Sequence, residues 1–278
     1  METRLDNALL PSSEEIEAFR ADGFYFSRRI FTDDELDRAI QAQDRFYEAP
    51  PNWPYAKRRP GGWKKGDAGK LRKSDYTSLM VPELMNLVLK PILGKIAARL
   101  MGERMRLWHD QLSYKEAGDS GDETVMGWHN DRGYWLACSS TEMISAWIPF
   151  TDLSEAMGPI TFLRGSHRWE GNDNLDFFSR DLPALEKKIL HHGNPLDRVP
   201  ARLRRGEVSF HHCRTLHCST ANRSDRPRRA LAVHMQPVSN RPVDGFFHFN
   251  KLLAGSGGKV DFADPKFFPL LGAEDGSC

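Results

Sequence analysis

The spacing of apolar residues along the chain predicts helices before about residue 102 and strands after it. Apolar side chains in the first part recur every three or four positions, as in helices that bury one face. Ser12 and Glu15 form a Ser-x-x-Glu capping pattern, and Gly102 suits a C-terminal glycine cap. We expect helices at about 12–20, from Thr32 to about 46, and at 81–102, with a short strand at 23–26.

From about Met105 the pattern changes to short alternating strands separated by turn residues. We expect strands at 105–114, 125–131, 142–150, 159–163, 207–212, 214–219 and 229–237. The stretch 172–192, rich in Leu, Asp and Lys, is the exception and is compatible with a helix. Many short strands without helices between them indicate a β-sandwich or barrel. The predicted fold is therefore mostly β with flanking helices, in one domain spanning 1–278.

Composition and charge are those of an ordinary soluble globular protein. Of the 278 residues, 40% are hydrophobic and 28% charged, and the net charge is +1. This balance predicts neither a nucleic-acid nor a membrane partner, and no run approaches the ~18 apolar residues of a transmembrane helix. The N-terminal residues lack the layout of a signal peptide. The four cysteines form no C-x-x-C pair, so we expect free thiols and a cytoplasmic location.

Residues 50–75 differ from their surroundings, because prolines and glycines there make a regular element unexpected. Residues 57–73 include eight basic residues and a single acidic one, Asp67. They are Lys57, Arg58, Arg59, Lys64, Lys65, Lys70, Arg72 and Lys73. Two interpretations stay open: a solvated surface loop, or a lid that helps capture an anionic substrate, since clustered cations focus potential at a cleft mouth.

A candidate metal site begins in the predicted strand 125–131. Successive side chains of a strand alternate between faces, so His129 and Asp131 are expected on the same face. With one further histidine, such a pair makes the two-histidine, one-carboxylate triad that holds a divalent metal. His-x-Asp alone is a weak signal, because many such pairs are a surface carboxylate beside an unrelated histidine.

A second polar cluster follows at 217–228. His217 and Ser219 share one face of a predicted strand, and residues 221–227 have the composition of a tight connection. If Ala221 pairs with Arg228 in a hairpin, Arg228 lies on the face of His217 and Ser219, and Arg229 points away. This register is an assumption, and it favours Arg228 over Arg229.

These segments together resemble the phytanoyl-CoA dioxygenase-like group of iron(II)/2-oxoglutarate-dependent oxygenases. The similarity rests on the spacing of His129-x-Asp131, His217 and Arg228, with a Gly-Ser-His segment at 165–167 between them. Trp108-His109-Asp110-Gln111 before the metal strand is also typical, and the resemblance covers about 12–240. It implies a double-stranded β-helix, a cupin-like jelly roll, flanked by N-terminal helices. We expect the helices at 12–101, the core at about 103–240 and a C-terminal tail at 241–278, for which the family offers no counterpart.

The resemblance also implies roles for individual residues and three cofactors or cosubstrates: Fe(II), 2-oxoglutarate and O2. His129, Asp131 and His217 would ligate the iron, and no catalytic residue is implied beyond these ligands. Arg228 would bind the distal carboxylate of 2-oxoglutarate with help from Ser219. Further cosubstrate contacts would come from Gln111 and Trp147.

The implied reaction oxidises a C–H bond of a small molecule while 2-oxoglutarate is converted to succinate and CO2. A guanidinium suits the distal carboxylate because it donates two parallel hydrogen bonds. Related halogenases have a small residue at the position of Asp131, so the carboxylate favours hydroxylation or another oxidation. The substrate and the oligomeric state stay open. Two other classes are weighed: a non-catalytic metal-binding cupin acting as a sensor, and a zinc hydrolase, which has no use for Arg228.

The remaining candidate residues have structural interpretations beside functional ones. Tyr134 and Trp135 either line the substrate pocket or belong to the core. Cys218 faces away from His217, so we expect it to pack. The other histidines are interpreted as structural or surface groups, namely His109, His167, His191, His192, His211, His212, His234 and His248.

Overall fold

Two antiparallel β-sheets form the centre of the computed structural model, which describes residues 7–49, 51–52, 63, 71–118, 121–171, 175–176, 179–246, 253 and 260–272. The larger sheet has the strand order β1-β8-β5-β10-β3-β2, and the smaller has the order β4-β9-β6-β7. The larger sheet comprises β1 (Phe24–Phe26), β8 (Ser209–His212), β5 (Ile144–Pro149), β10 (Arg228–Pro237), β3 (Met105–Lys115) and β2 (Leu71–Asp75). The smaller comprises β4 (Met126–His129), β9 (His217–Ser219), β6 (Ile160–Leu163) and β7 (Arg198–Pro200).

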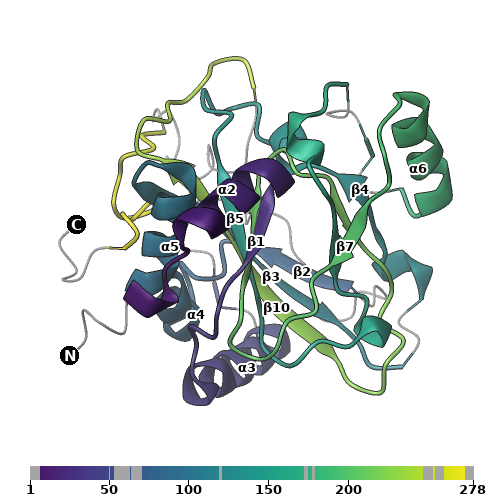
Figure 1. Cartoon of the computed structure of the whole chain (residues 1–278). Helices are drawn as coiled ribbons and strands as arrows, with labels where there is room; N and C mark the ends of the chain where they lie inside the picture. The colour runs from purple at the N-terminus through teal and green to yellow at the C-terminus, as the bar shows by residue number, and fades with distance from the viewer. Residues whose placement is uncertain are drawn as a thin grey trace.

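From β3 to β10 the chain passes from one sheet to the other at almost every step. This winding places strands that are adjacent in sequence in opposite sheets, and it makes a double-stranded β-helix. Figure 1 shows the strands crossing the middle of the molecule with helices outside them. The predicted fold class, mostly β with a jelly-roll core and flanking helices, is confirmed.

The α-helices whose full bounds lie in the described part of the chain are outside the sheets: α2 (Ser13–Asp22), α3 (Asp33–Glu48), α4 (Pro82–Val88), α5 (Pro91–Met101) and α6 (Leu182–His191). The expected caps are present, since Ser12 with Glu15 and Thr32 with Glu35 each form a capping box. The single helix expected at 81–102 is wrong. It is two helices, because Pro91 disfavours a helical conformation at Lys90, which has φ −57° and ψ 119°.

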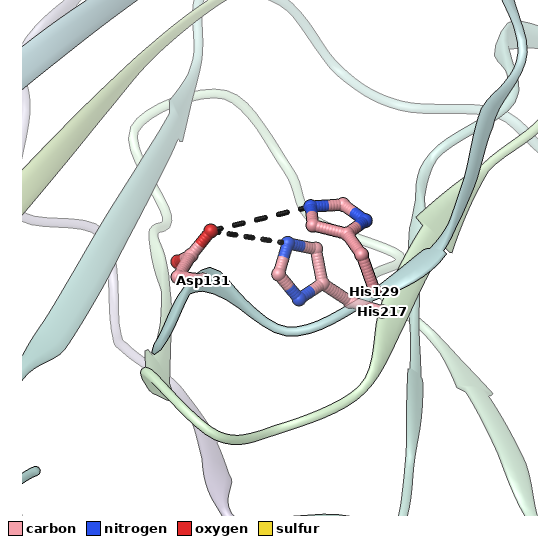
Figure 2. Close-up of side chains that lie close together, drawn as sticks. All are labelled: His129, Asp131 and His217. Atoms are coloured by element: carbon pink, nitrogen blue, oxygen red, sulfur yellow. Dashed lines mark ion pairs between the residues drawn. The ribbon is translucent and has the colours of Figure 1, made fainter. Parts of the chain in front are cut away.

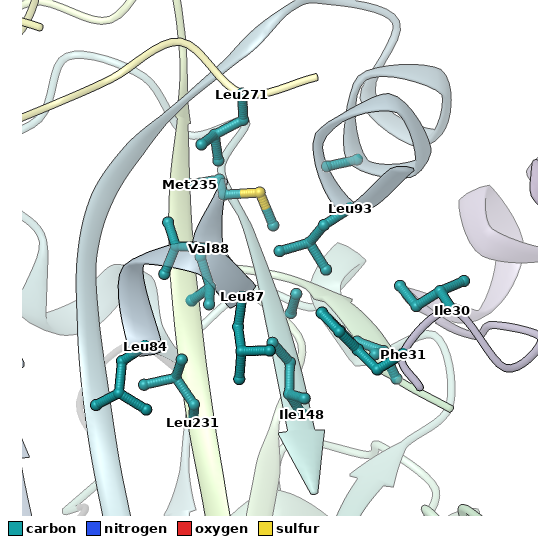
Figure 3. Close-up of a cluster of buried hydrophobic side chains, with 14 of the residues drawn as sticks. Ile30, Phe31, Leu84, Leu87, Val88, Leu93, Ile148, Leu231, Met235 and Leu271 are labelled. Carbon is teal, nitrogen blue, oxygen red and sulfur yellow. The ribbon is translucent and has the colours of Figure 1, made fainter. Parts of the chain in front are cut away.

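One apolar core joins the helices to the outer face of the larger sheet. Figure 3 shows side chains of α4 and α5 packed against Ile148 of β5 and Leu231 and Met235 of β10. Alternate residues of these strands therefore face the helices, and the residues between them face the smaller sheet. On the other side of the molecule α6 covers the smaller sheet through Leu185 and Ile189, which pack near Trp128.

Three of the differences from the sequence predictions bear on the site or on the basic segment. The strand expected at 125–131 ends at His129, and Asp131 begins a 3-10 helix, η2 (Asp131–Tyr134). The strand expected at 214–219 covers only His217–Ser219. No regular element was expected in 50–75, but residues 71–75 form β2. The backbone there pairs with β3 despite the basic side chains. Of the eight basic residues, only Arg72 and Lys73 lie within the described residues.

The hairpin assumed between the strands of His217 and Arg228 is also wrong. β9 belongs to the smaller sheet, where it pairs with β4 and β6. β10 belongs to the larger sheet, where Arg228 pairs with Lys115 of β3. The connection 220–227 therefore crosses from one sheet to the other, and side-chain alternation could not reveal this because alternation does not identify the neighbouring strand.

Candidate metal centre

Two histidines and one carboxylate converge between the sheets. Their donor atoms all lie within 4.8 Å of one another, and among the described residues they form the only group of this kind. The Nε2 atoms of His129 and His217 lie 4.0 and 3.8 Å from Oδ1 of Asp131. His129 and His217 occupy directly opposed positions of β4 and β9. Both imidazoles point toward Asp131 in Figure 2.

The backbone selects the tautomer of both imidazoles. Nδ1 of His129 lies 2.7 Å from the carbonyl oxygen of Gly127, and Nδ1 of His217 lies 2.9 Å from that of Thr215. A carbonyl can only accept, so each Nδ1 carries the hydrogen and each Nε2 presents its lone pair to the site. Burial lowers the pKa of His129 to about 4 and holds the pKa of His217 well below its usual value. Both imidazoles are therefore neutral, as metal ligation requires.

Asp131 reaches the site from the start of η2, beyond the end of the strand. The turn is held by Asn130, whose side-chain oxygen accepts from the backbone N–H of Gly133 at 2.9 Å. Asp131 Oδ2 accepts from Ser145 Oγ at 2.7 Å and from His211 Nε2 at 3.3 Å. Burial opposes ionisation, but the hydrogen bond from His211 and the nearby imidazoles hold the pKa of Asp131 well below its usual range. The carboxylate is ionised, and its Oδ1 is the atom presented to the two Nε2 atoms.

A polar row across the larger sheet supports Asp131. In register from β8 to β3, the row contains His211, Ser145, His234 and His109. Since the Ser145 hydroxyl donates its one hydrogen to Asp131, the Nδ1–H of His234, 2.7 Å away, must donate to Ser145 Oγ. Of the two interpretations given for His211 and His234, structural or surface groups, the structural one is correct: both are buried and lie within 4 Å of the Asp131 carboxylate. The sequence signal that could have placed His211 on the inner face is the alternation of polar residues along its strand, Ser209 and then His211.

Two further histidines singled out from the sequence, His212 and His248, are not part of this row. His212 faces outward, where its Nε2 donates to Glu142 at 3.4 Å, so it is the structural histidine that was expected. His248 lies outside the described residues. Cys218 packs with Trp128 and Leu163 behind the site, as expected. Cys138, Cys213 and Cys218 are buried free thiols, and Cys278 lies outside the described residues.

Arg228 lies between the sheets, on the inner face of β10. It is 2% exposed, and its Nη1 donates to the carbonyl of Gly158 at 2.6 Å. Its guanidinium carbon is 5.6 Å from the centre of the Trp147 ring, and its Nε has no hydrogen-bond partner among the described residues. Arg229 points the opposite way and pairs with Asp44 on α3 at 2.7 Å. The expected orientation of the two arginines is thus correct, although the register from which it was argued is wrong.

The other residues singled out from the sequence lie around this inner face. Gln111, Ala232 and Trp147 share one row across β3, β10 and β5. Ser219 is buried on β9 and accepts from Lys115 Nζ at 2.9 Å. Tyr134 is 44% exposed, with its ring 6.3 Å from that of His129. Trp135 is buried in an apolar cluster, with its ring 4.9 Å from that of His234.

The donor set fits iron(II) and 2-oxoglutarate. Two neutral imidazoles and one carboxylate are the ligands of non-haem iron(II) oxygenases, and they leave coordination positions open. Arg228 is a buried cation without an acidic partner among the described residues, which suits a carboxylate brought by a ligand. Burial lowers its pKa only to about 10, so the guanidinium stays charged.

Comparison with curated proteins finds relatives among dioxygenases. The chain is 25% identical over 248 residues to the ectoine dioxygenase of Bordetella parapertussis, covering 82% of this chain and 76% of the relative. It is also 25% identical over 187 residues to a probable alpha-ketoglutarate-dependent hypophosphite dioxygenase of Stutzerimonas stutzeri, covering 66% of this chain and 63% of that protein.

Comparison with solved structures finds the same fold. The non-heme alpha-ketoglutarate-dependent carbocyclase SnoK from nogalamycin biosynthesis matches with a TM-score of 0.71 at 26% identity, covering 94% of this chain and 96% of that one. The model of the family described as phytanoyl-CoA dioxygenase matches residues 19–230, which is most of the sequence. The chain therefore belongs to the phytanoyl-CoA dioxygenase family and is a non-haem iron(II)/2-oxoglutarate-dependent oxygenase.

Proposed function

We propose that His129, Asp131 and His217 hold the iron(II), that Arg228 and Ser219 bind the distal carboxylate of 2-oxoglutarate, and that the enzyme hydroxylates a small molecule. The bound metal supplies oxidative chemistry, in which O2 and 2-oxoglutarate are consumed and succinate and CO2 are formed. Gln111 and Trp147, on the same inner face as Arg228, are the proposed further contacts of the cosubstrate.

The observation that carries this proposal is the orientation of the three donors. Both Nδ1–H groups are engaged by backbone carbonyls, and Oδ2 of Asp131 is engaged by Ser145. The two Nε2 atoms and Oδ1 are thus aimed at one point before any metal binds, which reduces the cost of organising the ligands. The carboxylate of Asp131 supports hydroxylation over halogenation, because it would occupy the metal coordination position that a halide takes when the residue here is small.

The proposed substrate is a small molecule that enters beside Tyr134 and Trp135. An anionic substrate is supported by Lys73, which lies in the inner-face row of Ser113. Its charge adds to the larger effect of burial in lowering the pKa of His129. The proposed role of Lys57, Arg58 and Arg59 in capturing that substrate concerns residues outside the described part of the chain.

The proposed setting is a reducing cytoplasm, and the proposed unit of function is the single domain. Three buried free thiols support the first proposal. The core shared by the helices and the larger sheet supports the second. None of the helices in the described part of the chain has both the length and the apolar character needed to cross a bilayer.

The metal assignment is tested by anaerobic titration of the protein with iron(II) and 2-oxoglutarate. A weak visible charge-transfer band should develop in the wild type and be absent in His217→Ala. The matched control is His212→Ala, because His212 is also a buried histidine but binds Glu142 outside the cluster. A band of full intensity in His217→Ala would remove this residue from the ligand set.

The reaction is tested by succinate release with a panel of small molecules. The panel begins with ectoine and hypophosphite, the compounds after which two of the relatives are named. A true substrate should raise succinate formation and yield a hydroxylated product. Once a substrate is known, the salt dependence of its specificity constant tests the basic residues, since salt screens exposed charges over ~8 Å at physiological ionic strength. A specificity constant indifferent to salt, with a charge-neutralised variant of Lys57, Arg58 and Arg59 matching wild type, would remove their role in capture.

A further inference from the structure

A buried lysine lies beside the proposed 2-oxoglutarate site. Lys115 ends β3, has no exposed surface, and pairs in register with Arg228 of β10. Residues directly opposed in an antiparallel pair project their side chains to the same face. Both cations therefore belong to the space between the sheets.

Lys115 is bound to the strand that carries His217 and Ser219. Its Nζ donates to Ser219 Oγ at 2.9 Å and to the carbonyl of Thr220 at 2.7 Å. These bonds join the end of β3 in the larger sheet to the end of β9 in the smaller one. An ammonium group has three N–H bonds, so two are engaged and one is left for another acceptor.

The two cations lack a counter-ion in the described part of the chain. No described carboxylate pairs with either cation: among the described residues, Lys115 donates to Ser219 and Thr220, and Arg228 donates to Gly158. Burial lowers the pKa of Lys115 well below its usual value, and the charge of Arg228 lowers it further, so an anion beside Lys115 is needed to favour its ammonium form. Like charges directly opposed in a sheet are destabilising, and buried charges without partners are costly. Such an arrangement is favourable when a ligand supplies the negative charge.

We propose that Lys115 is a positioning and specificity residue for the cosubstrate: it orients the Ser219 hydroxyl toward the distal carboxylate and, with Arg228, makes the site select 2-oxo acids that carry a second carboxylate. This inference rests on the proposed 2-oxoglutarate site. The hydroxyl of Ser219 accepts the Lys115 N–H through a lone pair, so its own hydrogen is directed elsewhere, toward the ligand. Neutralisation by the incoming carboxylate removes the repulsion between the two cations, and this gain is available only to a dicarboxylic ligand.

The test compares two ligands in the anaerobic, metal-loaded protein by isothermal titration calorimetry. 2-Oxoglutarate carries the distal carboxylate, and 2-oxobutanoate has the same 2-oxo acid end without it. Wild type should bind 2-oxoglutarate far more tightly. Lys115→Met removes the charge and the donors at similar length, and Lys115→Gln removes the charge but retains an amide donor on a shorter side chain. Each should weaken 2-oxoglutarate binding roughly tenfold or more and change 2-oxobutanoate binding less than about twofold, given the strength of hydrogen bonds to charged groups.

The matched control is Arg229→Met, which removes a half-buried cation from the opposite face of β10 and should leave both affinities unchanged. If Lys115 acts through Ser219, the loss of 2-oxoglutarate binding free energy in the double variant Lys115→Gln, Ser219→Ala should be smaller than the sum of the losses in the two single variants. Equal weakening of both ligands would indicate a merely structural lysine and overturn the inference. Wild-type discrimination in either foldable Lys115 variant would also overturn it. A wild type that does not distinguish the two ligands would instead contradict the proposed 2-oxoglutarate site itself.

Discussion

Removing the Ser145 hydroxyl should weaken metal binding without altering any proposed ligand. Ser145 has no exposed surface, and its Oγ donates to Asp131 Oδ2 at 2.7 Å. Hydrogen bonds to charged groups are worth about 1.5–3 kcal/mol, and loss of a partner that orients a metal ligand costs roughly 10–100-fold in affinity. In Ser145→Ala the carboxylate keeps only the 3.3 Å bond from His211. We therefore expect the dissociation constant for the metal to rise by about 10–100-fold.

The assay is anaerobic titration of the metal-free protein with iron(II) against a competing chelator, together with urea unfolding. Ser145→Ala also leaves Nδ1 of His234 without its acceptor, so stability should fall by about 1–3 kcal/mol. The matched control is Ser209→Ala, because Ser209 is equally buried in the neighbouring strand and its Oγ has no hydrogen-bond partner in the described part of the chain. It should change neither metal affinity nor stability appreciably. Metal affinity in Ser145→Ala within about twofold of wild type would refute the idea that this hydroxyl orients Asp131.

Three further predictions follow from burial and charge at the site. Burial lowers the pKa of His129 to about 4, so as the pH falls the imidazole becomes protonated in the unfolded chain before it does in the folded one. The metal-free protein should therefore lose up to roughly 3 kcal/mol of unfolding free energy between pH 6.5 and 4, and a flat urea-unfolding profile there would contradict the buried neutral imidazole. Burial raises the pKa of Cys138 to about 12 and also raises the pKa of Cys213 and Cys218, so native protein should resist iodoacetamide at all three, and rapid labelling by peptide mass spectrometry would argue against their burial. Asp131→Gly should abolish hydroxylation, and a chlorinated product from wild type in high chloride would rule out the hydroxylase assignment.

The sequence by itself determined the local elements and the identity of the three converging donors. Capping residues and side-chain periodicity act over a few positions, so the helix starts at Ser12 and Thr32 and most strand positions could be predicted. The spacing of His129, Asp131 and His217 was enough to indicate the metal site through the family resemblance. The orientation of Arg228 against Arg229 was also correct, because neighbours in any strand face opposite ways.

Only the tertiary structure decided which strands lie beside one another and what surrounds the donors. β9 and β10 follow each other in sequence but belong to different sheets, so the assumed hairpin gave a correct orientation for a wrong reason. Asp131 reaches its position from a 3-10 turn, supported by His211 and Ser145 from strands distant in sequence. Lys115 meets Ser219 in the same way. A residue's alternation specifies its face, whereas its neighbour across the sheet depends on how the whole chain buries its apolar surface, and this non-local choice is not encoded in any short segment.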